Sequence, residues 1–114
     1  MNTPLMPRIE LLYIPCPSLK EAHAISSALL DSRLIACANI VESRSIYNWK
    51  GRREKGREFI IFAKTTPKKA QKAQKMVKKL HSYEIPCVLR FSVQANTGYA
   101  KWVASETKYS RPTK

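Results

Sequence analysis

The sequence predicts an α+β domain in which two helices lie on one face of an antiparallel sheet. Three observations lead to this class. Strand-like and helix-like segments follow one another in the order β-α-β-β-α-β. Two right-handed crossovers would place both helices on the same face of the sheet. The chain has 114 residues, enough for a single domain with a core of its own.

The first strand and first helix are marked by local signals. Arg8 to Ile14 is a mostly apolar run, and Pro15 and Pro17 are expected to end it. Ser18 and Glu21 then have the spacing of a capping box, which starts a helix expected to run to about Asp31. The apolar stripe of this helix consists of Ala22, Ile25 and Leu29.

A long hairpin follows. Two β-rich runs, 35–49 and 57–64, flank an expected loop from Lys50 to Gly56. The first run is longer than the usual strand of ~3–10 residues. We therefore expect its far end to reach another subunit or to bend near Glu42 and Ser43.

The second run of the hairpin is apolar on both faces. Phe59 and Ile61 point to one face of the sheet, and Ile60 and Phe62 point to the other. Because the helices can cover only one face, a second copy of the chain is expected on the other. The predicted interface residues are Tyr47, Trp49, Phe59 and Ile61.

The second helix begins with Thr66 as N-cap and Pro67 at its first position. Its apolar face is formed by Ala70, Ala73, Met76, Val77 and Leu80, and a basic stripe lies outside. The net charge of +13 makes this stripe and the hairpin arginines a candidate surface for anions or for weak, salt-sensitive, sequence-independent nucleic-acid binding. The candidate residues are Lys68, Lys72, Lys75, Lys79, Arg52 and Arg53. A merely solvated face is the alternative.

The remaining segments complete the order. Residues 85–93 predict a fourth strand, residues 96–98 a turn, and Tyr99, Trp102 and Val103 a short third helix. This arrangement is a ferredoxin-like βαββαβ sandwich with a C-terminal helix. The domain is expected to span residues 8–109, between a flexible arm (1–7) and a disordered tail (110–114).

Composition excludes some classes of protein. There is no run of 18 apolar residues, so no membrane partner is expected. The N-terminus lacks the features of a secretory signal, and three cysteines at Cys16, Cys37 and Cys87 lack zinc-type spacing. Reduced thiols in the cytoplasm are therefore expected.

Five segments together resemble one known family. They read RLIACANI (33–40), SIYNWKG (45–51), AKT (63–65), HSYEIP (81–86) and YAKWV (99–103). In this order they are similar to the CutA family of divalent-cation tolerance proteins, over about residues 9–107. The resemblance implies a PII-like homotrimer associated with tolerance to copper and other divalent cations, without enzymatic activity.

Three departures from the family pattern concern charge and ligands. Ser82 stands where the family has proline, and Cys87 stands where it usually has glutamate. The expected hairpin loop is basic, whereas the family usually carries acidic residues there.

A metal site is the first candidate for chemistry. Cys16, His81, Glu84 and Cys87 offer ligand types suited to copper or another divalent cation, although their spacing is not a ligand motif. The alternatives are structural thiols at Cys16 and Cys87, a histidine near a helix C-terminus, and a glutamate that accepts hydrogen bonds.

Two other classes of protein match the sequence less well. An RNA-recognition domain has the same element order, and residues 55–62 match much of its RNP1 motif, although Arg57 and Glu58 replace an aromatic and a small residue. An enzyme is not expected, because the sequence has no catalytic triad order and no glycine-rich phosphate loop.

Overall fold

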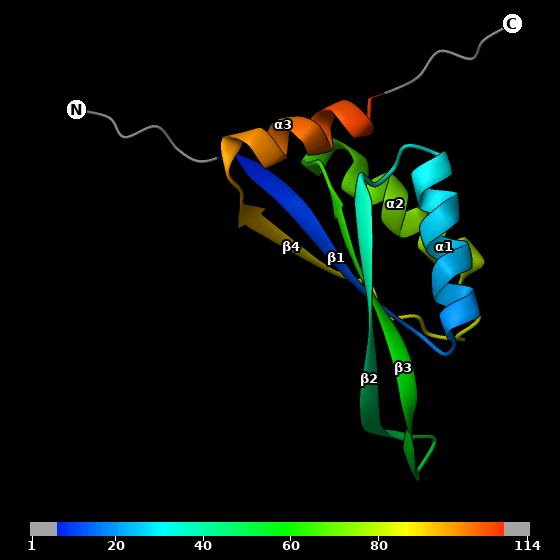
Figure 1. Ribbon diagram of the computed structural model, residues 1–114. Coiled ribbons are helices and arrows are strands. Elements are labelled where there is room, and N and C mark those ends of the chain that lie inside the picture. Colours follow the sequence, from blue (N-terminus) through cyan, green and yellow to red (C-terminus); the bar gives the residue numbers. More distant parts are fainter. Residues whose placement is uncertain (1–6, 109–114) are drawn as a thin grey trace, which may run out of the picture.

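The structure is a computed structural model that describes residues 7–108. Its elements are β1 (Arg8–Cys16), α1 (Leu19–Asp31), β2 (Cys37–Trp49), β3 (Arg52–Thr65), α2 (Pro67–Leu80), β4 (Leu89–Gln94) and α3 (Thr97–Glu106). The strands form one antiparallel sheet in the order β2-β3-β1-β4 (Figure 1). The predicted ferredoxin-like fold with a C-terminal helix is confirmed.

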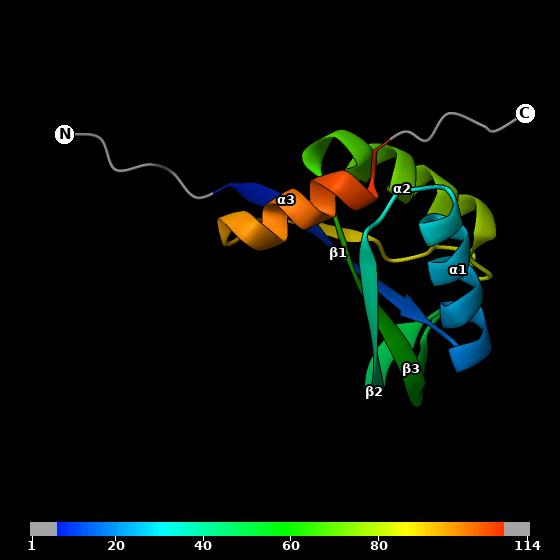
Figure 2. The same ribbon diagram turned by 45° about the horizontal axis from the view of Figure 1, so that its top comes forward.

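The main core lies between the sheet and the first two helices (Figures 1 and 2). Leu12 and Ile61 from the sheet, Leu29 from α1 and Val77 from α2 are fully buried there. Burying such side chains stabilises the fold by roughly 1.5–3 kcal/mol each. The Ser18 hydroxyl caps α1 as predicted, accepting a hydrogen bond of 3.1 Å from the Glu21 N–H.

The opposite face of the sheet is covered at one end by α3. Val103 is fully buried there against Ile9, in a small cluster separate from the main core. Elsewhere on this face Ile60 is buried, whereas three large apolar side chains, Val41, Leu89 and Phe91, remain about half exposed. Val41 lies on one edge strand, β2, and Leu89 and Phe91 lie on the other, β4; we refer to these three residues together as the uncovered apolar patch.

The hairpin is tighter than predicted. Strand pairing continues to Trp49 and Arg52, so the turn is only Lys50 and Gly51 instead of a loop to Gly56. Both residues have positive φ, 50° and 78°, as in the hairpin turns whose twist matches that of the strands. The distal hairpin (residues 43–58) projects beyond the helices without a bend at Glu42 (Figure 1).

Two strand boundaries also differ from prediction. β1 continues through Pro15 to Cys16. Proline has no N–H to donate, and the strand tolerates this because β4 pairs with β1 only as far as Tyr13, so no neighbouring strand on that side lacks a hydrogen bond. β4 starts at Leu89 instead of Ile85, and residues 85–88 are irregular around Pro86.

The prediction that Phe59 and Ile61 of β3 lie at a subunit interface was wrong. Phe59 and Ile61 lie under the helices, where Ile61 is fully buried and Phe59 packs against the main core. Neither side chain is therefore available for the predicted subunit interface. Ile60 and Phe62 occupy the opposite face, where Phe62 makes an edge-to-face contact with Tyr13 at 5.6 Å between ring centroids.

The predictions for the chain ends lie mostly outside the described residues, since residues 1–6 and 109–114 are not described. Pro7, assigned to the arm, belongs to the fold: its carbonyl accepts a 2.9 Å hydrogen bond from the Ala95 N–H. Within residues 7–108, no helix has the length and apolar character needed to cross a membrane.

Candidate functional site

A hollow of about 790 Å³ separates the distal hairpin from the loop 81–88 that connects α2 to β4. Aromatic rings and carboxylates dominate its lining, which includes Tyr13, Tyr47, Trp49, Glu54, Glu58, Tyr83, Glu84 and Cys87. We refer to it as the Glu58 hollow. An apolar hollow with a few converging polar groups is typical of a ligand site.

Glu58 of β3 is the centre of the polar contacts in this hollow. Its carboxylate accepts a 2.5 Å hydrogen bond from the Ser45 hydroxyl of β2 and a 2.7 Å hydrogen bond from the Tyr83 hydroxyl. Burial and the hydrogen bond to Glu58 raise the pKa of Tyr83 above its ordinary value. The Tyr83 hydroxyl therefore stays protonated at neutral pH and joins the loop to the hairpin.

His81 anchors the start of this loop and is not a free metal ligand. Its Nε2 lies 2.6 Å from the Pro15 carbonyl oxygen, which can only accept, so Nε2 carries the proton. Its Nδ1 then accepts a 3.1 Å hydrogen bond from the Tyr83 N–H. Both ring nitrogens of this fully buried side chain are thus occupied within the chain.

Glu21 secures the same loop from α1. Its carboxylate accepts a 3.0 Å hydrogen bond from the Ser82 N–H. The predicted capping box is therefore only half formed, because this hydrogen bond uses the Glu21 side chain elsewhere.

The other predicted metal ligands are dispersed. Cys16 is fully buried, and burial, with smaller contributions from Glu21 and Glu58, raises its pKa to about 12. Cys87 is exposed on the loop, and partial burial and Glu58 raise its pKa. Glu84 pairs with Lys50 at 3.5 Å on the surface.

These positions do not form a metal centre. Among residues 7–108, no group of three or more His, Cys, Asp or Glu side chains is placed to hold a metal ion. A thiol with so high a pKa is also a poor source of the thiolate that binds metals. The predicted set of Cys16, His81, Glu84 and Cys87 is therefore not a ligand cluster within one chain.

The predicted anion surface is divided between two places. Lys68, Lys72, Lys75 and Lys79 are exposed on α2, whereas Arg52 and Arg53 lie at the tip of the hairpin. The tip points away from α2 (Figure 1). These six residues therefore do not make one continuous surface.

Tyr47 and Trp49 remain on the hairpin as predicted, partly exposed at 46% and 36%. Lys50 lies over the Trp49 ring, with its Nζ 5.5 Å from the ring centroid. Large rings exposed at this level on a projecting hairpin are typical of residues that become buried in an assembly.

The RNA-recognition interpretation fails on the position of Phe59. That motif needs its aromatic side chains on the uncovered face of the sheet, where bases can stack. Phe59 instead packs on the helix-covered face, opposite Cys16 of β1.

Sequence reasoning missed Glu58 and Tyr83 as a pair. They are 25 positions apart and meet only because the loop folds back onto the hairpin. The available signal was a carboxylate directly before the large apolar run of residues 59–62.

Comparisons with known proteins extend over almost the whole domain. The family model described as CutA1 divalent ion tolerance protein matches residues 10–106. The divalent-cation tolerance protein CutA of Pyrococcus horikoshii is 35% identical over 86% of this chain and 97% of its own length. That of Thermotoga maritima is 37% identical over 82% of this chain and 93% of its own length.

Solved structures agree with these relatives. CutA1 from Ehrlichia chaffeensis superposes with a TM-score of 0.86 at 32% identity, covering 93% of this chain and all of that chain. The protein from Archaeoglobus fulgidus, described as a periplasmic divalent cation tolerance protein CutA, has a TM-score of 0.85 at 32% identity. It covers 88% of this chain and 99% of that chain.

Proposed function

This chain belongs to the CutA1 divalent ion tolerance protein family, and we propose that it acts as a non-catalytic homotrimer in tolerance to copper and other divalent cations. The observation that carries the proposal is the family match over residues 10–106. No alternative class accounts for so much of the chain.

The uncovered apolar patch supports assembly. Leu89 and Phe91 are neighbours on one face of β4, 47% and 46% exposed, and Val41 is 48% exposed at the opposite edge of the same sheet face. Large apolar side chains that adjoin one another in water, as on β4, often mark an interaction surface. A ring of three copies would cover this face and the hairpin aromatics Tyr47 and Trp49. It would also protect the free edge of β2 from uncontrolled strand pairing.

A divalent cation does not fit the residues of a single chain, as the occupied ring of His81 and the buried thiol of Cys16 indicate. The tolerance role is therefore proposed for the assembled protein. Cys87 and Glu84 offer metal-ligand types on the loop beside the hairpin aromatics, which the proposed trimer would bury.

Two measurements test the proposal. Light scattering should give a mass near three times 13.0 kDa, and a stable monomer at micromolar concentration would refute the trimer. Calorimetry with copper should detect binding by the trimer. Binding that is weaker in Cys87→Ser but unchanged in Cys16→Ser would identify the exposed Cys87 thiol as a copper ligand. The absence of binding would contradict a direct interaction of the protein with copper.

The proposed location is the cytoplasm. All three cysteines are free, as expected for thiols kept reduced. Fractionation of cells that produce the protein tests this, and recovery from the periplasm or medium would contradict it.

A further inference from the structure

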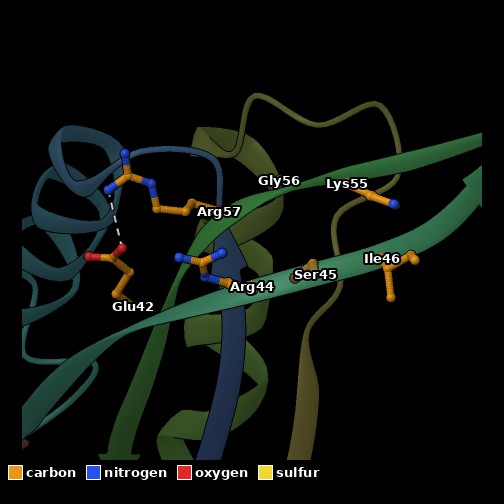
Figure 3. Close-up of a pocket in the computed structure, with 7 residues that line it drawn as sticks. All are labelled: Glu42, Arg44, Ser45, Ile46, Lys55, Gly56 and Arg57. Carbon is orange, nitrogen blue, oxygen red and sulfur yellow. Dashed lines mark hydrogen bonds and ion pairs between the residues drawn. The ribbon is translucent and has the colours of Figure 1, made fainter.

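A second hollow, of about 860 Å³, lies along the distal hairpin (Figure 3). It is lined by Glu42, Arg44, Ser45, Ile46, Lys55, Gly56 and Arg57. It shares only Ser45 and Ile46 with the Glu58 hollow. We propose that it binds a small organic phosphate or polyphosphate, a function that goes beyond cation tolerance.

The charges in this hollow are unbalanced. Arg44 of β2 and Arg57 of β3 are directly opposite in the strand register, and like charges in such a position destabilise a sheet. Lys55 lies two residues from Arg57, on the same face of β3. Three cations therefore line one face of the hairpin, on a stretch where Glu42 is the lining carboxylate.

Neutralisation within the chain is incomplete. Arg57 pairs with Glu42 at 3.2 Å, and the side chains of both are more than half exposed. Arg44 and Lys55 form no side-chain hydrogen bond or ion pair with any residue between 7 and 108. Figure 3 shows the Arg44 guanidinium beside the paired Arg57, with the Lys55 ammonium further along the hairpin. A bound anion would relieve this repulsion.

The side chains select the kind of anion. Guanidinium groups bind phosphate oxygens through two parallel N–H donors, and a multivalent phosphate can engage more than one cation at once. The hollow is open, because its walls are mostly exposed side chains of one hairpin, and its volume exceeds that needed for one inorganic ion. Ile46, 60% exposed beside Lys55, adds an apolar surface for the organic part.

The setting favours a small ligand over a long nucleic acid. The cations project from paired strands, which hold their backbones in register. The exposed lysines of α2 lie on a separate element, away from the hairpin (Figure 1), so the basic surface of the hollow does not continue onto α2.

The test uses tripolyphosphate as probe and the full-length protein at low salt. Calorimetry should detect binding that Arg44→Gln weakens roughly tenfold or more, because a charge-assisted hydrogen bond is lost. Lys72→Gln, on α2, makes the same change in net charge and should alter the affinity by less than about twofold, because it lies outside the hollow. Equal losses in the two variants would show a non-specific charge effect and overturn the proposal.

Melting temperature provides a second readout. Without phosphate, Arg44→Gln should melt at or above the temperature of the unsubstituted protein, since it removes a like-charge pair. With tripolyphosphate the unsubstituted protein should be stabilised more than the variant. If tripolyphosphate does not bind and Arg44→Gln dissociates the oligomer, a carboxylate of a neighbouring copy occupies the hollow and the proposal is wrong.

Discussion

Cys16 illustrates how position determines the chemistry of a side chain in this fold. Its thiol lies in the main core and is fully buried, with the Ile14 carbonyl oxygen 3.8 Å away as its hydrogen-bond acceptor. Burial disfavours the thiolate, so the folded chain holds the Cys16 pKa at about 12 against an ordinary value of 9.0. The exposed Cys87 is the thiol that reagents and ions reach first.

This difference predicts a loss of stability at high pH. As pH rises from 9 to 12, the unfolded chain releases the Cys16 proton while the folded chain retains it, so the free energy of unfolding falls. The decline attributable to this group is at most about 4 kcal/mol, at ~1.4 kcal/mol per pH unit.

Urea denaturation across this pH range measures the effect. Cys16→Ala should show a shallower decline than the unsubstituted protein. Tyr83→Phe removes the contribution of Tyr83, whose raised pKa acts in the same direction. Parallel pH profiles for Cys16→Ala and the unsubstituted protein would contradict the assignment.

At the scale of elements, the hairpin depends on its two-residue turn. Lys50 and Gly51 both adopt positive φ, which is easy for glycine and costly for most other residues. Strands of 13 and 14 residues extend from this turn. The turn therefore sets the register of β2 against β3, on which the positions of the residues lining both hollows depend. The Lys50–Glu84 ion pair is exposed and is expected to add little.

Gly51→Ala should therefore lower the free energy of unfolding by about 1 kcal/mol. Gly56→Ala is the matched control, because an added Cβ would meet open space at either position but only Gly51 has positive φ. Within a strand, alanine should be neutral or stabilising by up to about 1 kcal/mol. Chemical denaturation of both variants decides the matter, and equal effects would mean that turn strain is not the cause.

For the whole molecule, the two sheet faces differ in how completely one chain covers them. Helices α1 and α2 bury the first face, whereas α3 covers only one end of the second. The uncovered apolar patch and the projecting hairpin thus leave apolar surface that folding of one chain does not remove from water. This is the physical basis of the proposed trimer.

Phe91→Asp should separate assembly from folding. Phe91 is 46% exposed in one chain, so an aspartate should be tolerated by the fold but should place charges in the proposed interface. Leu30→Asp, on α1 at 41% exposure and away from that face, is the control. Light scattering should show dissociation of Phe91→Asp only, with similar circular dichroism for both. A trimer that survives Phe91→Asp would place the interface elsewhere.

The sequence by itself determined the elements and their order, because their signals act over a few residues. The Ser18 cap and the proline at the first position of α2 are local interactions, and both helices begin where these residues predict. Alternation along β3 likewise showed that Phe59 and Ile61 share one face. The five motifs were enough to indicate the family.

Only the tertiary structure decided which face the helices cover and which side chains meet in the hollows. Ile61 is under the helices because of the side on which two crossovers pack, which alternation cannot reveal. His81 meets Pro15 across 66 positions, and Tyr83 meets Glu58 across 25. Such contacts depend on the packing energy of the whole chain, and each is made only after distant segments have been brought together.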